Sequence, residues 1–123
     1  MATLLVAAPH GEMDRQNIFY PMLKGAISKI DSLEEIIVRE GNTFAERWAK
    51  DYAEHNNIRF RTMPAYWKTE GEWAGFNRNK HLSMIADYGL VFWDGFSKDI
   101  RYLLQELKRS HVPTKLVLVE MTK

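Results

Sequence analysis

Short apolar runs alternate with segments of helical periodicity along the whole chain, and this alternation constrains the fold more than any other feature. Five runs are predicted to be strands, with a helical segment between each consecutive pair: residues 3–8, 35–39, 59–63, 89–93 and 115–120. Strands joined by helices run parallel, and the helices cover the sheet. The order predicts an α/β fold, a Rossmann-like three-layer sandwich of about five mostly parallel strands with helices on both faces.

The predicted helices occupy residues 18–30, 44–55, 76–86 and 98–109, and residues 64–75 are expected to form a loop. In the first of these, Pro21 is tolerated only near a helix start, so the regular helix is expected from about Pro21 onward. Thr43 and Glu46 have the spacing of a capping box before the second helix. Ser97 is a good N-cap residue for the last helix.

Length and composition bound the organisation and the class of partner. A chain of 123 residues with 46% hydrophobic residues suits one domain over residues 1–123. The absence of cysteine excludes disulfides, cysteine–zinc sites and thiol catalysis. A net charge of +1 without a basic stripe argues against nucleic acid as a partner. No run reaches membrane-spanning length, so no membrane association and a cytoplasmic location are expected.

Ligands of such sheets lie beyond the carboxyl ends of the strands, which singles out the loops 9–14, 40–43 and 94–97. The last two lead into helix N-termini, which suit phosphate groups. Gly41 and Gly95 would let the backbone approach a ligand, although each could equally be an ordinary turn glycine. The dinucleotide fingerprint, the P-loop and the hydrolase elbow are all absent. The potential ligands in the 10–14 loop match no metal spacing, so neither a metal nor a cofactor is expected.

The stretch 64–79 is unusual because it places several aromatic residues among charged ones: Tyr66, Trp67, Trp73 and Phe76. Aromatic rings can stack on a planar base, and Arg78 can bind a phosphate or carboxylate through two hydrogen bonds. The alternative is structural. The tryptophans would then be core residues, and Arg78 would anchor the loop through Glu70 or Glu72.

Four motifs between residues 45 and 97 carry a family resemblance: AERWA at 45–49, PAYW at 64–67, AGFNRN at 74–79 and VFWDGFS at 91–97. Together they resemble the YspA-like branch of the SLOG superfamily over about the whole chain. The resemblance implies a Rossmann-like domain that binds nucleotides or nucleotide-derived molecules. Homo-oligomers are common among SLOG domains, so a homo-oligomer is expected by analogy.

The chain departs from the phosphoribohydrolases of that superfamily at two places. Their phosphate loop continues with Gly-Thr after the serine, whereas this chain has Lys98, Asp99 and Ile100. Their catalytic acid falls on Tyr102. A hydrolase without its acid would be weak or inactive, so no catalytic residue is assigned.

The expected function is therefore binding of a nucleotide-derived small molecule, such as an ADP-ribose-like or cyclic nucleotide signal, by a sensor or sequestering protein. The alternatives are a nucleotide N-glycosidase of the phosphoribohydrolase type and a ligand-free protein-interaction module. Motifs and loops together predict these ligand-binding residues: Pro9, His10, Gly11, Gly41, Asn42, Thr43, Trp67, Arg78, Asn79, Trp93, Asp94, Gly95, Phe96, Ser97 and Lys98.

Overall fold

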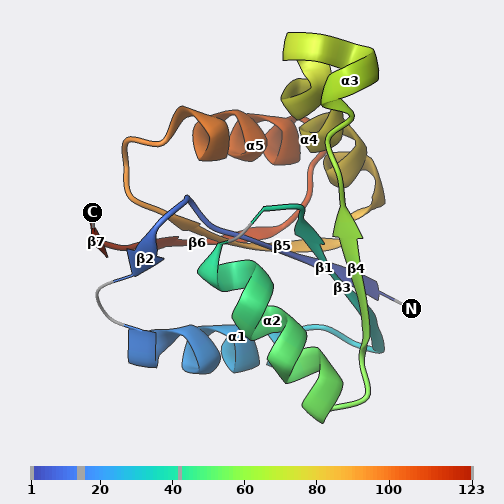
Figure 1. Cartoon of the computed structure of the whole chain (residues 1–123). Helices are drawn as coiled ribbons and strands as arrows, with labels where there is room; N and C mark the ends of the chain where they lie inside the picture. The colour runs from blue at the N-terminus through green and yellow to red at the C-terminus, as the bar shows by residue number, and fades with distance from the viewer. Residues whose placement is uncertain (1, 14–15, 42, 123) are drawn as a thin grey trace.

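A five-stranded parallel sheet forms the centre of the protein (Figure 1). The computed structural model describes residues 2–13, 16–41 and 43–122. Spatial order across the sheet is β4-β3-β1-β5-β6, and every neighbouring pair is parallel. The strands are β1 (Ala2–Ala7), β3 (Leu33–Arg39), β4 (Arg59–Met63), β5 (Tyr88–Trp93) and β6 (Thr114–Leu118). The predicted α/β fold is confirmed.

Helices cover both faces of this sheet, as Figure 1 shows. The helices α1 (Phe19–Ser28) and α2 (Phe44–His55) lie on one face, and α4 (Ala74–Ile85) and α5 (Lys98–Arg109) lie on the other. Side chains of a strand alternate between the faces, and Leu4 and Leu5 accordingly belong to two different core clusters. This explains why the sequences of the central strands are continuous apolar runs, without the alternation of apolar and polar residues that a strand buried on one face shows.

Aromatic rings fill much of the core under α1 and α2. Phe19 of α1 is fully buried and stacks on Phe92 of β5 with ring centroids 5.3 Å apart. Phe44 of α2 meets both rings edge-on, at 6.0 Å and 5.6 Å. On the opposite face Leu82 of α4 and Ile100 of α5 are fully buried. The two helical layers are therefore each held by their own apolar cluster.

The direction in which successive strands are added to the sheet reverses beside β1. From β1 the chain moves outward through β3 to β4, and then returns to the other side of β1 as β5. The loops after β1 and β5 therefore diverge, which leaves a crevice at the carboxyl end of the sheet. The site described below lies at this end.

The structure differs from the expected boundaries in several places. Helix α1 begins at Phe19 rather than Pro21; Pro21 lies in its first turn, where its missing N–H leaves no intrahelical bond unmade. Strand β6 ends at Leu118, and the short strand β7 (Met121–Thr122) pairs antiparallel with β2 (Glu12–Met13). Two-residue strands carry too little pattern to be predicted.

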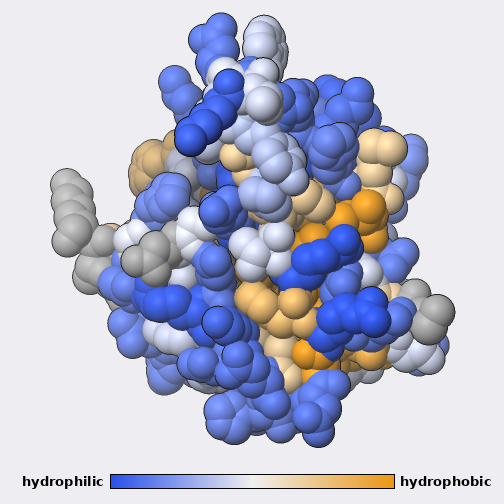
Figure 2. Space-filling view, turned by 45° about the vertical axis from the view of Figure 1, so that its right-hand side comes forward, coloured by the Kyte–Doolittle hydropathy of each residue, from blue (hydrophilic) through white to orange (hydrophobic). Residues whose placement is uncertain are grey.

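The predicted loop 64–75 contains two short helical segments. These are α3 (Trp67–Glu70) and a 3-10 turn (Gly71–Trp73), which leads directly into α4. Figure 1 shows α3 projecting beyond the end of β4. In the part of the chain that the structure describes, no helix is long and apolar enough to cross a membrane. Hydrophilic residues cover most of the face in Figure 2, with an apolar area in its right-hand half.

Candidate functional site

The loops that follow β1 and β3 meet at the carboxyl end of the sheet. A Cβ built on Gly41 would lie 3.7 Å from Cε1 of His10, so the two loops are in contact. Gly11 has φ +107°, a backbone conformation that favours glycine and turns the first loop. The sequence predicted all three residues as site residues, and the fold brings them together.

The start of α2 is fixed by a capping arrangement close to the predicted one. The hydroxyl of Thr43 accepts a hydrogen bond from the Glu46 amide at 3.3 Å. Glu46 reaches back as expected, but its carboxylate accepts from the amide of Gly41, at 3.1 Å. Burial raises the pKa of Glu46, and the Gly41 hydrogen bond opposes that rise. Asn42, also a predicted site residue, lies outside the described residues.

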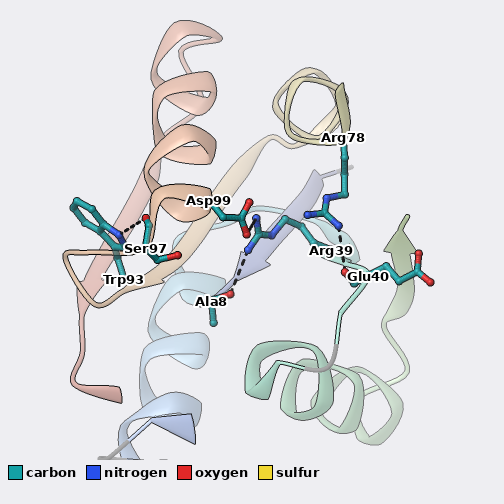
Figure 3. A network of polar contacts seen from close by, with 7 residues as sticks. All are labelled: Ala8, Arg39, Glu40, Arg78, Trp93, Ser97 and Asp99. Atoms are coloured by element: carbon teal, nitrogen blue, oxygen red, sulfur yellow. Dashed lines mark hydrogen bonds and ion pairs between the residues drawn. The ribbon is translucent and has the colours of Figure 1, made fainter. Parts of the chain in front are cut away.

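Arg39 is a buried cation at the last position of β3. Its side chain is 8% exposed; Nη1 lies 2.8 Å from Oδ2 of Asp99, and Nη2 donates to the carbonyl of Ala8 at 3.3 Å (Figure 3). Burial lowers the pKa of Arg39, and the carboxylate of Asp99 opposes that effect. The ion pair joins β3 to the first turn of α5 across the carboxyl ends of the strands.

Arg78 approaches the same space from α4, and its guanidinium points toward the loop after β3 (Figure 3). Nη1 donates to the carbonyl of Glu40 at 3.2 Å, while Nε is buried without a hydrogen-bond partner. Burial and the nearby charge of Arg39 lower the pKa of Arg78. The alternative expected from the sequence was that Arg78 anchors the preceding loop through Glu70 or Glu72, and the hydrogen bond of Arg78 goes to Glu40 instead. Glu70 accepts a hydrogen bond from Asn77, at 2.9 Å.

A pocket of about 370 Å³ opens beside Arg78, between α3, α4 and α5. This volume is within the range of small-molecule sites. Asn79 lines the pocket, is only 2% exposed, and its Oδ1 atom has no hydrogen-bond partner. The pocket is lined by His10, Trp67, Glu72, Gly75, Phe76, Arg78, Asn79, Asp99 and Tyr102.

Aromatic rings form much of this lining. Trp67 lies over Gly75, whose Cβ, if present, would be 3.5 Å from the indole. Phe76 packs against Tyr102 with centroids 5.1 Å apart, so rings from α4 and α5 meet in the pocket. Trp67 is 58% exposed and Trp73 63% exposed, so the alternative that these tryptophans are core residues is wrong.

The turn between β5 and α5 uses its polar groups internally. Oδ1 of Asp94 accepts from the amides of Phe96 and Ser97, at 2.9 and 2.8 Å, and the indole N–H of Trp93 donates to the Ser97 carbonyl at 3.0 Å. Burial raises the pKa of Asp94, but these backbone hydrogen bonds outweigh it and hold the pKa below its ordinary value. Ser97 is the N-cap residue of α5, as predicted, although its side chain makes no capping hydrogen bond.

The predicted residues thus fall into two groups. His10, Trp67, Arg78 and Asn79 line the pocket of about 370 Å³, called the large pocket in contrast to a cavity of about 20 Å³ that Thr43 lines with His10 and Arg78. The remaining described residues line neither cavity: Pro9, Gly11, Gly41, Trp93, Asp94, Gly95, Phe96, Ser97 and Lys98.

Sequence reasoning did not select several residues that line the cavities. Arg39 could have been found, because it is a charged residue at the carboxyl end of an apolar strand. Asp99 and Tyr102 stand out in the sequence only as departures from a hydrolase pattern, and both line the large pocket. Glu72 has no sequence signal of its own, because its position depends on the unpredicted helical turns before α4.

No group of three or more metal-ligating side chains lies together among residues 2–13, 16–41 and 43–122. The lining therefore offers guanidinium groups, carboxylates and aromatic rings rather than a metal centre. Such a set can hold a planar ring and pair with an anion. No protein-family model, curated protein or solved structure matches the chain.

Proposed function

We propose that the chain binds a nucleotide-derived small molecule in the pocket beside Arg78 and acts as a sensor or sequestering protein for that signal. The observation that carries the proposal is the burial of Arg78 with part of its hydrogen-bonding capacity unused. Its Nε is buried without a partner at the edge of an aromatic pocket. A desolvated cation with unused hydrogen-bonding capacity is a group that an anionic ligand can satisfy.

The rings support a nucleotide rather than a simple anion. Trp67, Phe76 and Tyr102 offer apolar surface on which a base can stack, and each such contact contributes about 1–3 kcal/mol. Asn79 adds a polar side chain for reading ring or ribose groups. An ADP-ribose-like molecule or a cyclic nucleotide combines the required ring and anion.

The motifs and the fold together are the grounds for placing the chain in the SLOG superfamily. Its Rossmann-like sheet and the pocket position of Arg78 and Asn79, both within the AGFNRN motif, agree with that proposal. We also propose a cytoplasmic location. By the same analogy we propose a homo-oligomer, which size-exclusion chromatography with light scattering would test.

An N-glycosidase is the second candidate, because two carboxylates line the pocket. Glu72 is exposed, and Asp99 is paired with Arg39. A catalytic acid must be able to reach the leaving base, and the Asp99 carboxylate is held by Arg39. Release of free base from nucleoside monophosphates, proportional to protein concentration and lost in Arg78→Ala, would favour this candidate.

A melting-temperature screen tests the binding proposal. Nucleotides, ADP-ribose variants and cyclic dinucleotides are added to the protein, to Arg78→Ala and to Arg109→Ala, which alters an exposed arginine at the far end of α5. A ligand at a hundred times its Kd adds about 2.7 kcal/mol to the free energy of unfolding. We expect a shift for the protein and Arg109→Ala but not for Arg78→Ala. No shift across the panel would refute binding and leave an interaction module formed by the exposed aromatic rings.

A further inference from the structure

The charges around the site are nearly balanced, although two arginines are present. Two arginines, Arg39 and Arg78, line the two cavities, together with three acidic residues, Asp99, Glu72 and Glu40. Only Arg78 of the two arginines lines the large pocket, whereas Asp99 and Glu72 both do. The pocket is therefore poorly suited to a phosphate group that carries two charges.

Arg39 is closed to a ligand mainly because its side chain is only 8% exposed, and its two internal contacts add to this. Asp99 occupies Nη1 and the Ala8 carbonyl occupies Nη2, and Figure 3 shows the Asp99 carboxylate between Arg39 and the helix that bears it. The cavity beside this pair has a volume of only about 20 Å³, room for about one water molecule. A phosphate could reach Arg39 only by displacing Asp99. In the arrangement observed, Arg78 is the one cation of this pair that faces the large pocket.

We propose that the site selects phosphate groups that carry one charge, such as phosphodiesters, over dianionic terminal phosphates, and that Asp99 is the residue that sets this preference. The inference rests on the proposed function, and it specifies in addition the charge that the phosphate group of the ligand carries. A phosphodiester brings one negative charge, which pairs with Arg78. A phosphomonoester carries nearly two charges above its second pKa of about 6. Its second charge meets Asp99 and Glu72 rather than a free cation.

The test compares two ligands that differ by one charge: adenosine 5′-monophosphate and its methyl ester. Their Kd values are measured by calorimetric titration at pH 8 for the unmodified protein, Asp99→Asn, Glu72→Gln and Glu54→Gln. The Asp99→Asn substitution keeps a side-chain oxygen for Arg39 and removes the negative charge. Glu54 is an exposed carboxylate on α2, on the opposite face of the sheet, and serves as the matched control.

We expect the unmodified protein and Glu54→Gln to bind the methyl ester roughly fivefold more tightly than the monophosphate, a ratio equivalent to about 1 kcal/mol. Asp99→Asn exposes the charge of Arg39 and should reverse the order in favour of the monophosphate. Glu72→Gln should reduce the ratio; because Glu72 is exposed, this variant keeps the test decisive if Asp99→Asn does not fold.

At pH 5 both ligands carry about one charge, so the ratio of their Kd values should approach one. Because the two ligands carry the same charge at pH 5, any change in charge of the titratable groups of the lining acts equally on both and cancels in the ratio at that pH; these groups are His10, Tyr102, Glu72, Asp99 and Arg78.

Tighter binding of the monophosphate by the unmodified protein at pH 8 would overturn the inference and leave the proposed function standing. The same holds if the ratio is unchanged in both Asp99→Asn and Glu72→Gln. Failure of all four proteins to bind either adenine ligand, together with no response in the wider nucleotide screen, would instead refute the proposed function, and the inference with it.

Discussion

Arg78→Lys separates ligand binding from folding, because the substitution keeps the charge and removes the planar guanidinium. In the folded protein the lost contact is the hydrogen bond from Nη1 to the Glu40 carbonyl, worth about 1 kcal/mol. The substitution also removes the buried Nε that has no partner, and leaving such a group unpaired costs about 1–3 kcal/mol. The two effects oppose each other, so the free energy of unfolding should rise by about 0–2 kcal/mol and should not fall.

Ligand binding should respond more strongly. A guanidinium binds a phosphate through two parallel hydrogen bonds, which an ammonium group cannot reproduce. Losing one charge-assisted hydrogen bond costs about 1.5–3 kcal/mol, equivalent to about tenfold to a hundredfold in Kd.

Calorimetric titration with a ligand found in the screen and a melting curve are measured on the same variant. Arg109→Lys is the control, because that exposed arginine forms its ion pair with Glu106 within α5, away from the pocket. A marked loss of stability with unchanged Kd would show that Arg78 is a structural residue, and the reasoning would fail.

Three further substitutions test separate parts of the account. Trp67→Ala should weaken nucleotide binding by about 1–3 kcal/mol in a titration while hardly changing the melting temperature, since the indole is 58% exposed; an unchanged Kd would remove it from the site. Gly95→Ala should lower unfolding stability by about 1 kcal/mol in denaturant titration, because Gly95 has φ +85° with nothing near its Cβ position; equal stability would argue against this turn geometry. The pKa of Asp94 is lowered on folding, so its stabilisation is present above its ordinary pKa and is lost as the pH falls through its folded value. Asp94→Asn should therefore reduce the loss of stability measured between about pH 4 and pH 2, and an unchanged profile would contradict the Asp94 hydrogen bonds.

The sheet could be predicted because its strands are buried on both faces. Leu4 and Leu5 belong to different core clusters, and this double burial produces the continuous apolar runs that the sequence displays. The start of α2 could be predicted for a local reason, since the spacing of Thr43 and Glu46 is sufficient for the capping bond.

The site could be predicted only in part. Arg78 and Trp67 are recognisable from their types and their neighbours in sequence. The ion pair of Arg39 with Asp99 joins residues 60 positions apart, and only the packing of α5 against the sheet brings them together. Ser97 occupies the N-cap position of α5 as expected, but its side chain makes no capping hydrogen bond. Residue type predicts the position of a cap, whereas the orientation of the side chain depends on the geometry of the turn.

The central claim is that the Arg78 pocket holds a nucleotide-derived anion. Mass spectrometry of small molecules released on denaturing the purified protein tests it most directly, with Arg78→Ala and Arg109→Ala prepared in parallel. The account predicts a nucleotide-derived species in stoichiometric relation to the unmodified protein and to Arg109→Ala, and its loss from Arg78→Ala. The same species at equal amounts in all three proteins would contradict the claim.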